Sequence, residues 1–157
     1  GVLMAHVDLL YKRVKEYLDS QDWKYNARDE KHIIDFGMNI DCKLKNCKVF
    51  IKCSDRAISC YAICPLNADE DTRPVVAEYL TRANYGLNNG NFEMDYSDGE
   101  IRYKTYMLCS QHVPDIKEVE LSVDLSFLMM KRYGNGLAKA LMGFGEPEKD
   151  IAEAEKD

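Results

Sequence analysis

Apolar and polar positions alternate along this chain with two different periods, and the changes of period mark its expected elements. Residues 4–18 carry an apolar side chain at every third or fourth position, which is the period of an amphipathic helix. Around 47–53 the alternation is strict, with Cys47, Val49 and Ile51 on one face, as in a strand. Applied to the whole chain, the two periods predict helices at 4–18, 72–87 and 115–141 and strands at 31–40, 48–53, 57–64, 92–96 and 101–109.

Turn signals join these elements into an α-β-β-β-α-β-β-α order. Ser54 to Arg56 is short enough for a hairpin, and Asp98-Gly99 between alternating segments is a strong hairpin signal. Single helices between antiparallel hairpins favour an α+β fold, in which an antiparallel sheet packs against helices. We expect one domain at 2–145. The charged tail at 146–157 is expected to be a short solvated helix or disordered.

Composition narrows the class of protein. The chain has 157 residues and 46% apolar residues, enough for one domain with its own core. Its net charge of -6 argues against a nucleic-acid partner. No apolar run reaches the roughly 18 residues of a membrane span, and no secretory signal precedes the first helix. We therefore expect a cytoplasmic protein that contacts neither nucleic acid nor membrane.

The six cysteines are the first candidates for chemistry. None of their spacings is the C-x2-C pair typical of zinc sites. Cys47 and Cys53 would lie about 20 Å apart on one strand, and Cys60 and Cys64 about 13 Å apart. We therefore expect reduced thiols that fill a face of the sheet, with no metal and no cofactor. Cys64, before Pro65 at a strand end, is the one thiol expected to be exposed.

The other polar residues do not form a recognisable catalytic motif. His6, His32 and His112 fall in a helix, a strand and a loop, and are interpreted as surface or capping residues. Asp95, Asp98 and Glu100 surround the second hairpin, in a segment too short for a calcium loop of about 12 residues. No glycine-rich phosphate-binding motif is present, because Gly134-Asn135-Gly136 lies within a helical pattern, which it is expected to bend or end early. We predict no catalytic, cofactor-binding or metal-binding residues.

The long helix at 115–141 is the most informative element, because it has two apolar stripes. One stripe suits packing on the sheet and comprises Ile116, Val119, Val123, Phe127, Met130, Leu137 and Leu141. On nearly the opposite side, Leu121, Leu125 and Leu128 form a second stripe. Either another helix of the same chain covers this stripe, or it is a dimer or partner surface. These leucines are therefore the candidate protein-binding or dimer surface.

The hairpin and the residues before it resemble those of a known family. The matching residues are Asn84, then Gly90-Asn91-Phe92-Glu93-Met94-Asp95, then Asp98-Gly99-Glu100-Ile101-Arg102-Tyr103-Lys104. Together with the element order, they resemble the YbjN-like family, known as bacterial sensory transduction regulators. The resemblance implies a type III secretion chaperone-like fold and a bias toward dimers, with no established catalytic residues.

These observations predict a non-enzymatic protein-binding module. We expect a chaperone-like or regulatory adaptor of bacterial origin, working as a homodimer with a protein partner or client. One alternative is a small-molecule or metal-responsive sensor that uses the cysteines or a pocket beside the sheet. The other is an enzyme, favoured only by residue types that most soluble proteins share.

Overall fold

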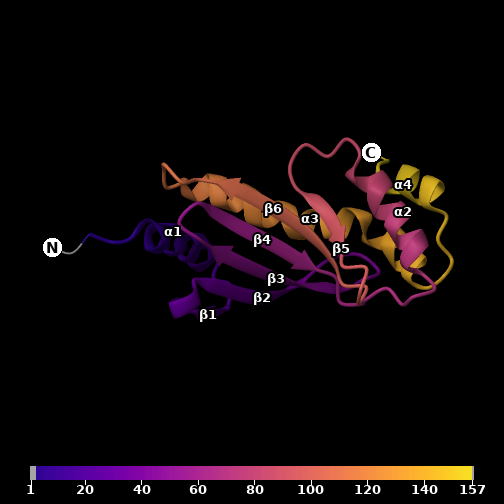
Figure 1. Cartoon of the computed structure of the whole chain (residues 1–157), viewed down its shortest axis with the longest axis horizontal. Coiled ribbons are helices and arrows are strands. Elements are labelled where there is room, and N and C mark those ends of the chain that lie inside the picture. The colour runs from indigo at the N-terminus through magenta and orange to yellow at the C-terminus, as the bar shows by residue number, and fades with distance from the viewer. Residues whose placement is uncertain (1–2, 157) are drawn as a thin grey trace.

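A six-stranded antiparallel sheet forms the centre of the computed structural model, which describes residues 3–156 (Figure 1). The strand order is β1-β2-β3-β4-β6-β5, and every neighbouring pair is antiparallel. Helices pack against the sheet. The predicted α+β class with an antiparallel sheet is therefore confirmed.

The central strands follow the predicted alternation closely. They are β2 (Ile33–Asn39), β3 (Asn46–Cys53) and β4 (Ala57–Ile63). The short turn between β3 and β4 closes as expected, because the N–H of Ser54 donates to the carbonyl of Ala57 at 3.0 Å. Alternate side chains of β3 are buried, as in a strand with one face on a core.

One strand was not predicted. β1 (Asn26–Arg28) pairs with β2 at the edge of the sheet, and all three of its residues are exposed. A 3-10 turn, η1 (Asp29–Lys31), follows it, so the predicted strand at 31–40 starts two residues later than expected. The prediction missed β1 because an exposed strand of this length has no apolar alternation to detect.

The second hairpin follows a short helix, α2 (Arg73–Asn84). Its strands are β5 (Asn91–Met94) and β6 (Ile101–Leu108). Gly99 takes a positive φ of 79° in the turn, where a side chain would collide with the backbone of Ala68. The Asp-Gly turn is thus fixed by its backbone conformation and by close packing.

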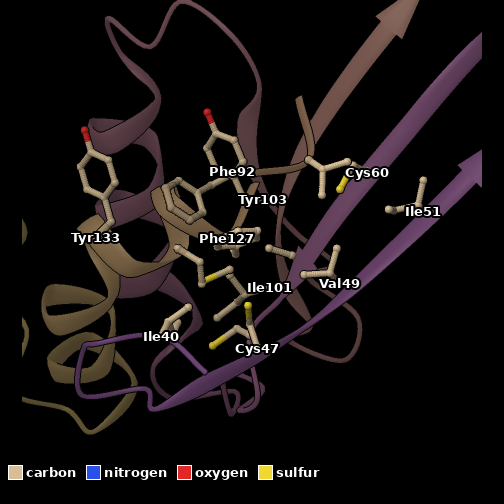
Figure 2. Packing of buried hydrophobic residues seen from close by; sticks show 14 of the residues in the cluster. Ile40, Cys47, Val49, Ile51, Cys60, Phe92, Ile101, Tyr103, Phe127 and Tyr133 are labelled. Atoms are coloured by element: carbon tan, nitrogen blue, oxygen red, sulfur yellow. The ribbon is translucent and has the colours of Figure 1, made fainter. Parts of the chain in front are cut away.

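Helices cover only one face of the sheet. α1 (His6–Ser20) and α3 (Ile116–Leu141) lie on that side, and α3 runs along β6 and β4 (Figure 1). The core lies between these layers (Figure 2), and its labelled members are Ile40, Cys47, Val49, Ile51, Cys60, Phe92, Ile101, Tyr103, Phe127 and Tyr133. Among residues 3–156, no helix packs on the opposite face of the sheet.

The charged C-terminal segment is a docked helix, α4 (Pro147–Ala154), rather than a solvated or disordered one. It packs against α2 and α3 (Figure 1). Ile151 is 8% exposed, and the buried carboxylate of Asp150 accepts a hydrogen bond from the N–H of Glu146 at 2.8 Å. A short helix is therefore present as one of the two expected outcomes, but it is docked rather than solvated, because Ile151 is buried and Asp150 caps its start.

Neither glycine of Gly134-Asn135-Gly136 ends α3, which continues to Leu141. A Cβ on Gly134 would collide with the side chain of Cys42, and a Cβ on Gly136 with the ring of Tyr79. The glycines therefore serve close packing against neighbouring segments, a role that the sequence pattern alone did not reveal.

Candidate protein-binding surface

The two apolar stripes of α3 have different environments. Asp115 caps the helix, since its carboxylate accepts a hydrogen bond from the N–H of Glu118 at 2.8 Å. Most of the first stripe is buried against the sheet, namely Val119, Val123, Phe127, Met130 and Leu137. The two ends of that stripe, Ile116 and Leu141, are only partly covered.

The second stripe is largely uncovered. Leu121 is 60% exposed and Leu128 is 45% exposed, while Leu125 is half-buried. Within the described chain, Leu121 and Leu128 are thus left without full cover, whereas Leu125 packs partly against the core. Leu121, Leu125 and Leu128 form an apolar strip on the outer side of α3, which we call the leucine face.

α1 lies along one flank of the leucine face. Tyr17 on α1 donates a hydrogen bond to the carboxylate of Asp124 on α3. Burial is the main cause that raises the pKa of Asp124, and it also raises the pKa of Tyr17. This contact fixes α1 on the side of α3 that points away from β6.

The other flank of α3 lies over β4 and β6. Ser122 accepts a hydrogen bond at its carbonyl from the hydroxyl of Thr105 on β6, at 2.9 Å. The thiol of Cys60 on β4 donates to the hydroxyl of Ser126 at 3.4 Å. This stretch of α3 therefore lies over both β4 and β6.

Beside this flank, part of β6 has no neighbouring strand. β5 pairs with β6 only from Ile101 to Lys104, although β6 continues to Leu108 (Figure 1). The backbone N–H of Cys64 bonds to the carbonyl of Ile101, so odd-numbered residues of β6 direct their backbone groups toward β4. Those of Tyr106 and Leu108 consequently point outward, to an edge that no described strand occupies.

Side chains along this edge are also uncovered. Tyr106 is 54% exposed and Leu108 is 66% exposed, and both lie on the helix-free face of the sheet. Met107 points to the helix side and is half-buried. We call residues 105–108 the free edge of β6. Sequence reasoning missed it, although the unequal lengths of the two alternating segments were a usable signal.

The cysteines do not form a reactive or metal-binding group. Cys64 is 3% exposed, so the expectation that it is accessible was wrong, and burial raises the pKa of its thiol to about 11. Burial likewise raises the pKa values of Cys47, Cys53 and Cys60 to about 12. Among residues 3–156, no three His, Cys, Asp or Glu side chains lie close enough together to hold a metal ion.

Two of the histidines and the hairpin carboxylates have structural contacts. A ring nitrogen of His6 lies 2.7 Å from the carbonyl of Cys109, and one of His32 lies 2.6 Å from the carboxylate of Asp8. Asp95 accepts hydrogen bonds from the backbone N–H and the hydroxyl of Ser97, within the turn. These side chains shape helix ends and turns.

The residues that carry the family resemblance are architectural. The side chain of Asn84 accepts from the N–H of Phe92 at 2.7 Å and donates to its carbonyl at 3.0 Å, which joins the end of α2 to β5. Gly90 has a positive φ and lies against Tyr103, whose hydroxyl donates to the carbonyl of Asn89 at 2.6 Å. The pattern therefore encodes the hairpin and not a site.

One of the comparisons with known proteins bears on the fold. No family model matches the chain, and no curated protein matches it. Among solved structures, the chain is similar to the crystal structure of "YbjN, a putative transcription regulator from E. coli", with a TM-score of 0.55 and 12% sequence identity. The match covers 79% of this chain and 90% of that one. The chain has a YbjN-like fold. The predicted resemblance is thus confirmed at the level of fold.

The hydropathy of the helices bears on whether any of them could span a membrane. In the part of the chain that the structure describes, no helix has both the length and the apolar character needed to cross a membrane.

Proposed function

We propose that this protein is a non-enzymatic regulatory or adaptor protein that acts by binding protein, with a second copy of itself as the first partner. The YbjN-like fold supports the regulatory class, since the similar E. coli protein is described as "a putative transcription regulator". The observation that carries the proposal is the leucine face. Leu121 and Leu128 stay exposed on a helix whose other side is buried in the core.

Exposed leucines in a row are typical of surfaces that associate with protein. An amphipathic helix normally presents a polar outer side to water, whereas α3 interrupts that side with three leucines. Among the described residues, five of the six cysteines are buried, and the hairpin carboxylates Asp95 and Asp98 accept hydrogen bonds within turns. Association through α3 is therefore the function that the geometry supports best.

Sedimentation velocity over a range of micromolar concentrations tests the proposal. We expect the wild type to sediment as a dimer and the variant Leu121→Lys/Leu125→Lys to sediment as a monomer, because a lysine pair on each copy would repel across the contact. Tyr85→Lys is the control, since Tyr85 is 90% exposed and lies outside α3, at the end of α2. Thermal melts establish that the variants are folded.

Two results would contradict the proposal. One is a wild type that remains monomeric at the highest concentration. The other is a wild-type dimer that the double lysine variant leaves intact, which would place the association elsewhere on the molecule.

A further inference from the structure

The free edge of β6 is an incomplete part of the sheet. Tyr106 and Leu108 direct their N–H and C=O groups outward, and no hydrogen bond among the described residues engages them. An exposed strand edge of this kind is a template for another strand, unless charge, proline or a covering segment protects it. Residues 105–108 contain no charged residue and no proline.

The outward-directed backbone N–H and C=O groups of this edge can pair with the same groups in a second copy of the chain. When two copies of β6 run antiparallel about a two-fold axis at Met107, Tyr106 of one copy faces Leu108 of the other, and the reverse. Both residues of each pair have outward-directed backbone groups, so each pair exchanges both of its hydrogen bonds. The edge is thereby satisfied with no group left over.

The space along β6 between β5 and the end of the strand favours this register. A register shifted toward the start of β6 would bring the incoming strand against Asn91 of β5, which already occupies the position opposite Lys104. In the register centred on Met107, the incoming strand ends before that point, because β6 ends at Leu108 and the chain turns at Ser110. The space available therefore matches the length of the strand.

α3 fits the same arrangement. It contacts β4 through Ser126 and β6 through Ser122, and the two-fold axis would lie half a strand spacing beyond β6. An α3 axis midway between those two strands lies about one strand spacing, about 4.8 Å, from the two-fold axis. With that placement the two copies of α3 would pass about 10 Å apart, at the upper end of the 8–10 Å found for packed helices.

The side chains at that helix crossing are apolar. Around the circumference of α3, the order from β4 outward is Ser126, Ser122, Leu125 and Leu121. Since Ser126 contacts β4 and Ser122 contacts β6, the next position, Leu125, faces beyond the free edge. The leucine face of each copy would therefore meet the other above the joined strands.

Resting on the proposed function, we infer that two copies of this chain join through the free edge of β6, in antiparallel register about Met107, with the α3 helices packed side by side above it. The product is a sheet that continues across both copies. Leu125 lies at the helix contact, Leu121 and Leu128 lie beside it, and Tyr106 and Leu108 form the hydrogen-bonded strand pairs.

Cysteine cross-linking on the full chain tests the register. Residue 107 would face its own copy as a non-hydrogen-bonded pair with Cα atoms about 4.5 Å apart, within the range for a disulfide. We expect Met107→Cys to form a disulfide-linked dimer under mild oxidation, reversed by reductant. Lys52→Cys, exposed in the interior strand β3, is the matched control and should stay monomeric on a denaturing gel, as should the wild type.

A mixing experiment checks the pairing independently. Tyr106→Cys and Leu108→Cys should each link poorly alone and link efficiently when the two variants are mixed, because position 106 faces position 108 of the other copy. A wild-type dimer without either cross-link would overturn the strand pairing and leave the proposed homodimer standing. A monomeric wild type would overturn both, and sedimentation velocity of the same samples separates the two cases.

Discussion

The close approach of Tyr79 to Gly136 gives a prediction about stability. Gly136 lies inside α3, and a Cβ at this position would lie 2.6 Å and 2.7 Å from ring carbons Cε2 and Cζ of Tyr79, and closer still to its hydroxyl oxygen. That hydroxyl is buried and donates to the carbonyl of Tyr133 at 2.6 Å. The substitution Gly136→Ala must therefore displace a fully buried ring, or the helix that carries it.

Helix propensity alone predicts the opposite result. Replacing glycine by alanine inside a helix stabilises by about 1 kcal/mol. Against this, overpacking a filled core costs about 1–3 kcal/mol. Loss of a buried hydrogen bond costs about 1–3 kcal/mol more. The sum predicts that Gly136→Ala lowers the free energy of unfolding by about 1–5 kcal/mol.

Chemical denaturation followed by circular dichroism measures this change, and thermal melts should show a loss of about 2–4 °C per kcal/mol. Gly37→Ala is the matched control, because a Cβ at Gly37 meets nothing within 4 Å and its φ is not positive. We expect that change to be neutral or to stabilise by up to about 1 kcal/mol. Pairing Gly136→Ala with Tyr79→Phe removes the nearest atom and should restore part of the loss.

The reasoning would be refuted if Gly136→Ala were as stable as the wild type. A second refutation would be an equal loss in Gly37→Ala, since the effect would then not depend on the contact with Tyr79.

Three further predictions follow from the contacts of single side chains. Asn84→Ala should lower the free energy of unfolding by about 1–3 kcal/mol in denaturant titrations, because it leaves the N–H of Phe92 without its partner and leaves Asn91 as the one side-chain donor to its carbonyl. Asn84→Asp, which retains the acceptor, should lose less. In native protein at pH 8, a thiol reagent should label half-buried Cys42 well before Cys64, because burial raises the pKa of the Cys64 thiol to about 11. Peptide mass spectrometry measures the labelling of each cysteine, and rapid labelling of Cys64 would contradict its burial. Burial raises the pKa of Asp124, so the folded protein binds the proton of this carboxyl group more tightly than the unfolded chain does. The contribution of Asp124 to stability should therefore fall as the pH rises through and above the ordinary range of a carboxyl group. Denaturation curves of Asp124→Asn measured across that range should lack this decline, and pH profiles identical to those of the wild type would disprove the prediction.

Much of the fold was predictable from local pattern. Strict alternation in β3 and the Asp98-Gly99 turn depend on neighbouring residues alone, and both were placed correctly. The stripe from Val119 to Leu137 was likewise identified as the side of α3 that packs on the sheet. These features were visible because the period of apolar residues reports directly on which face of a helix or strand is buried.

The sequence pattern identified the residues of the candidate surface but not whether they are exposed. Periodicity identified Leu121, Leu125 and Leu128 as a second stripe, but whether another helix covers it depends on where α1 and α2 pack. The position of α1 on the far flank, held by Tyr17 and Asp124, leaves the leucines exposed. Such contacts join residues that are distant in the chain, and no local period encodes them.

The sequence by itself determined the kinds and the order of most elements and the hairpin turns, though not β1, because these features depend on interactions between residues close in the chain. Only the tertiary structure decided that β5 stops four residues short of the end of β6, that α4 docks through Ile151, and that the glycines of α3 serve close packing. Register, edges and packing distances arise from non-local pairing, in which a strand edge is free or covered according to what lies beside it in space. The free edge of β6 is therefore a property of the folded sheet.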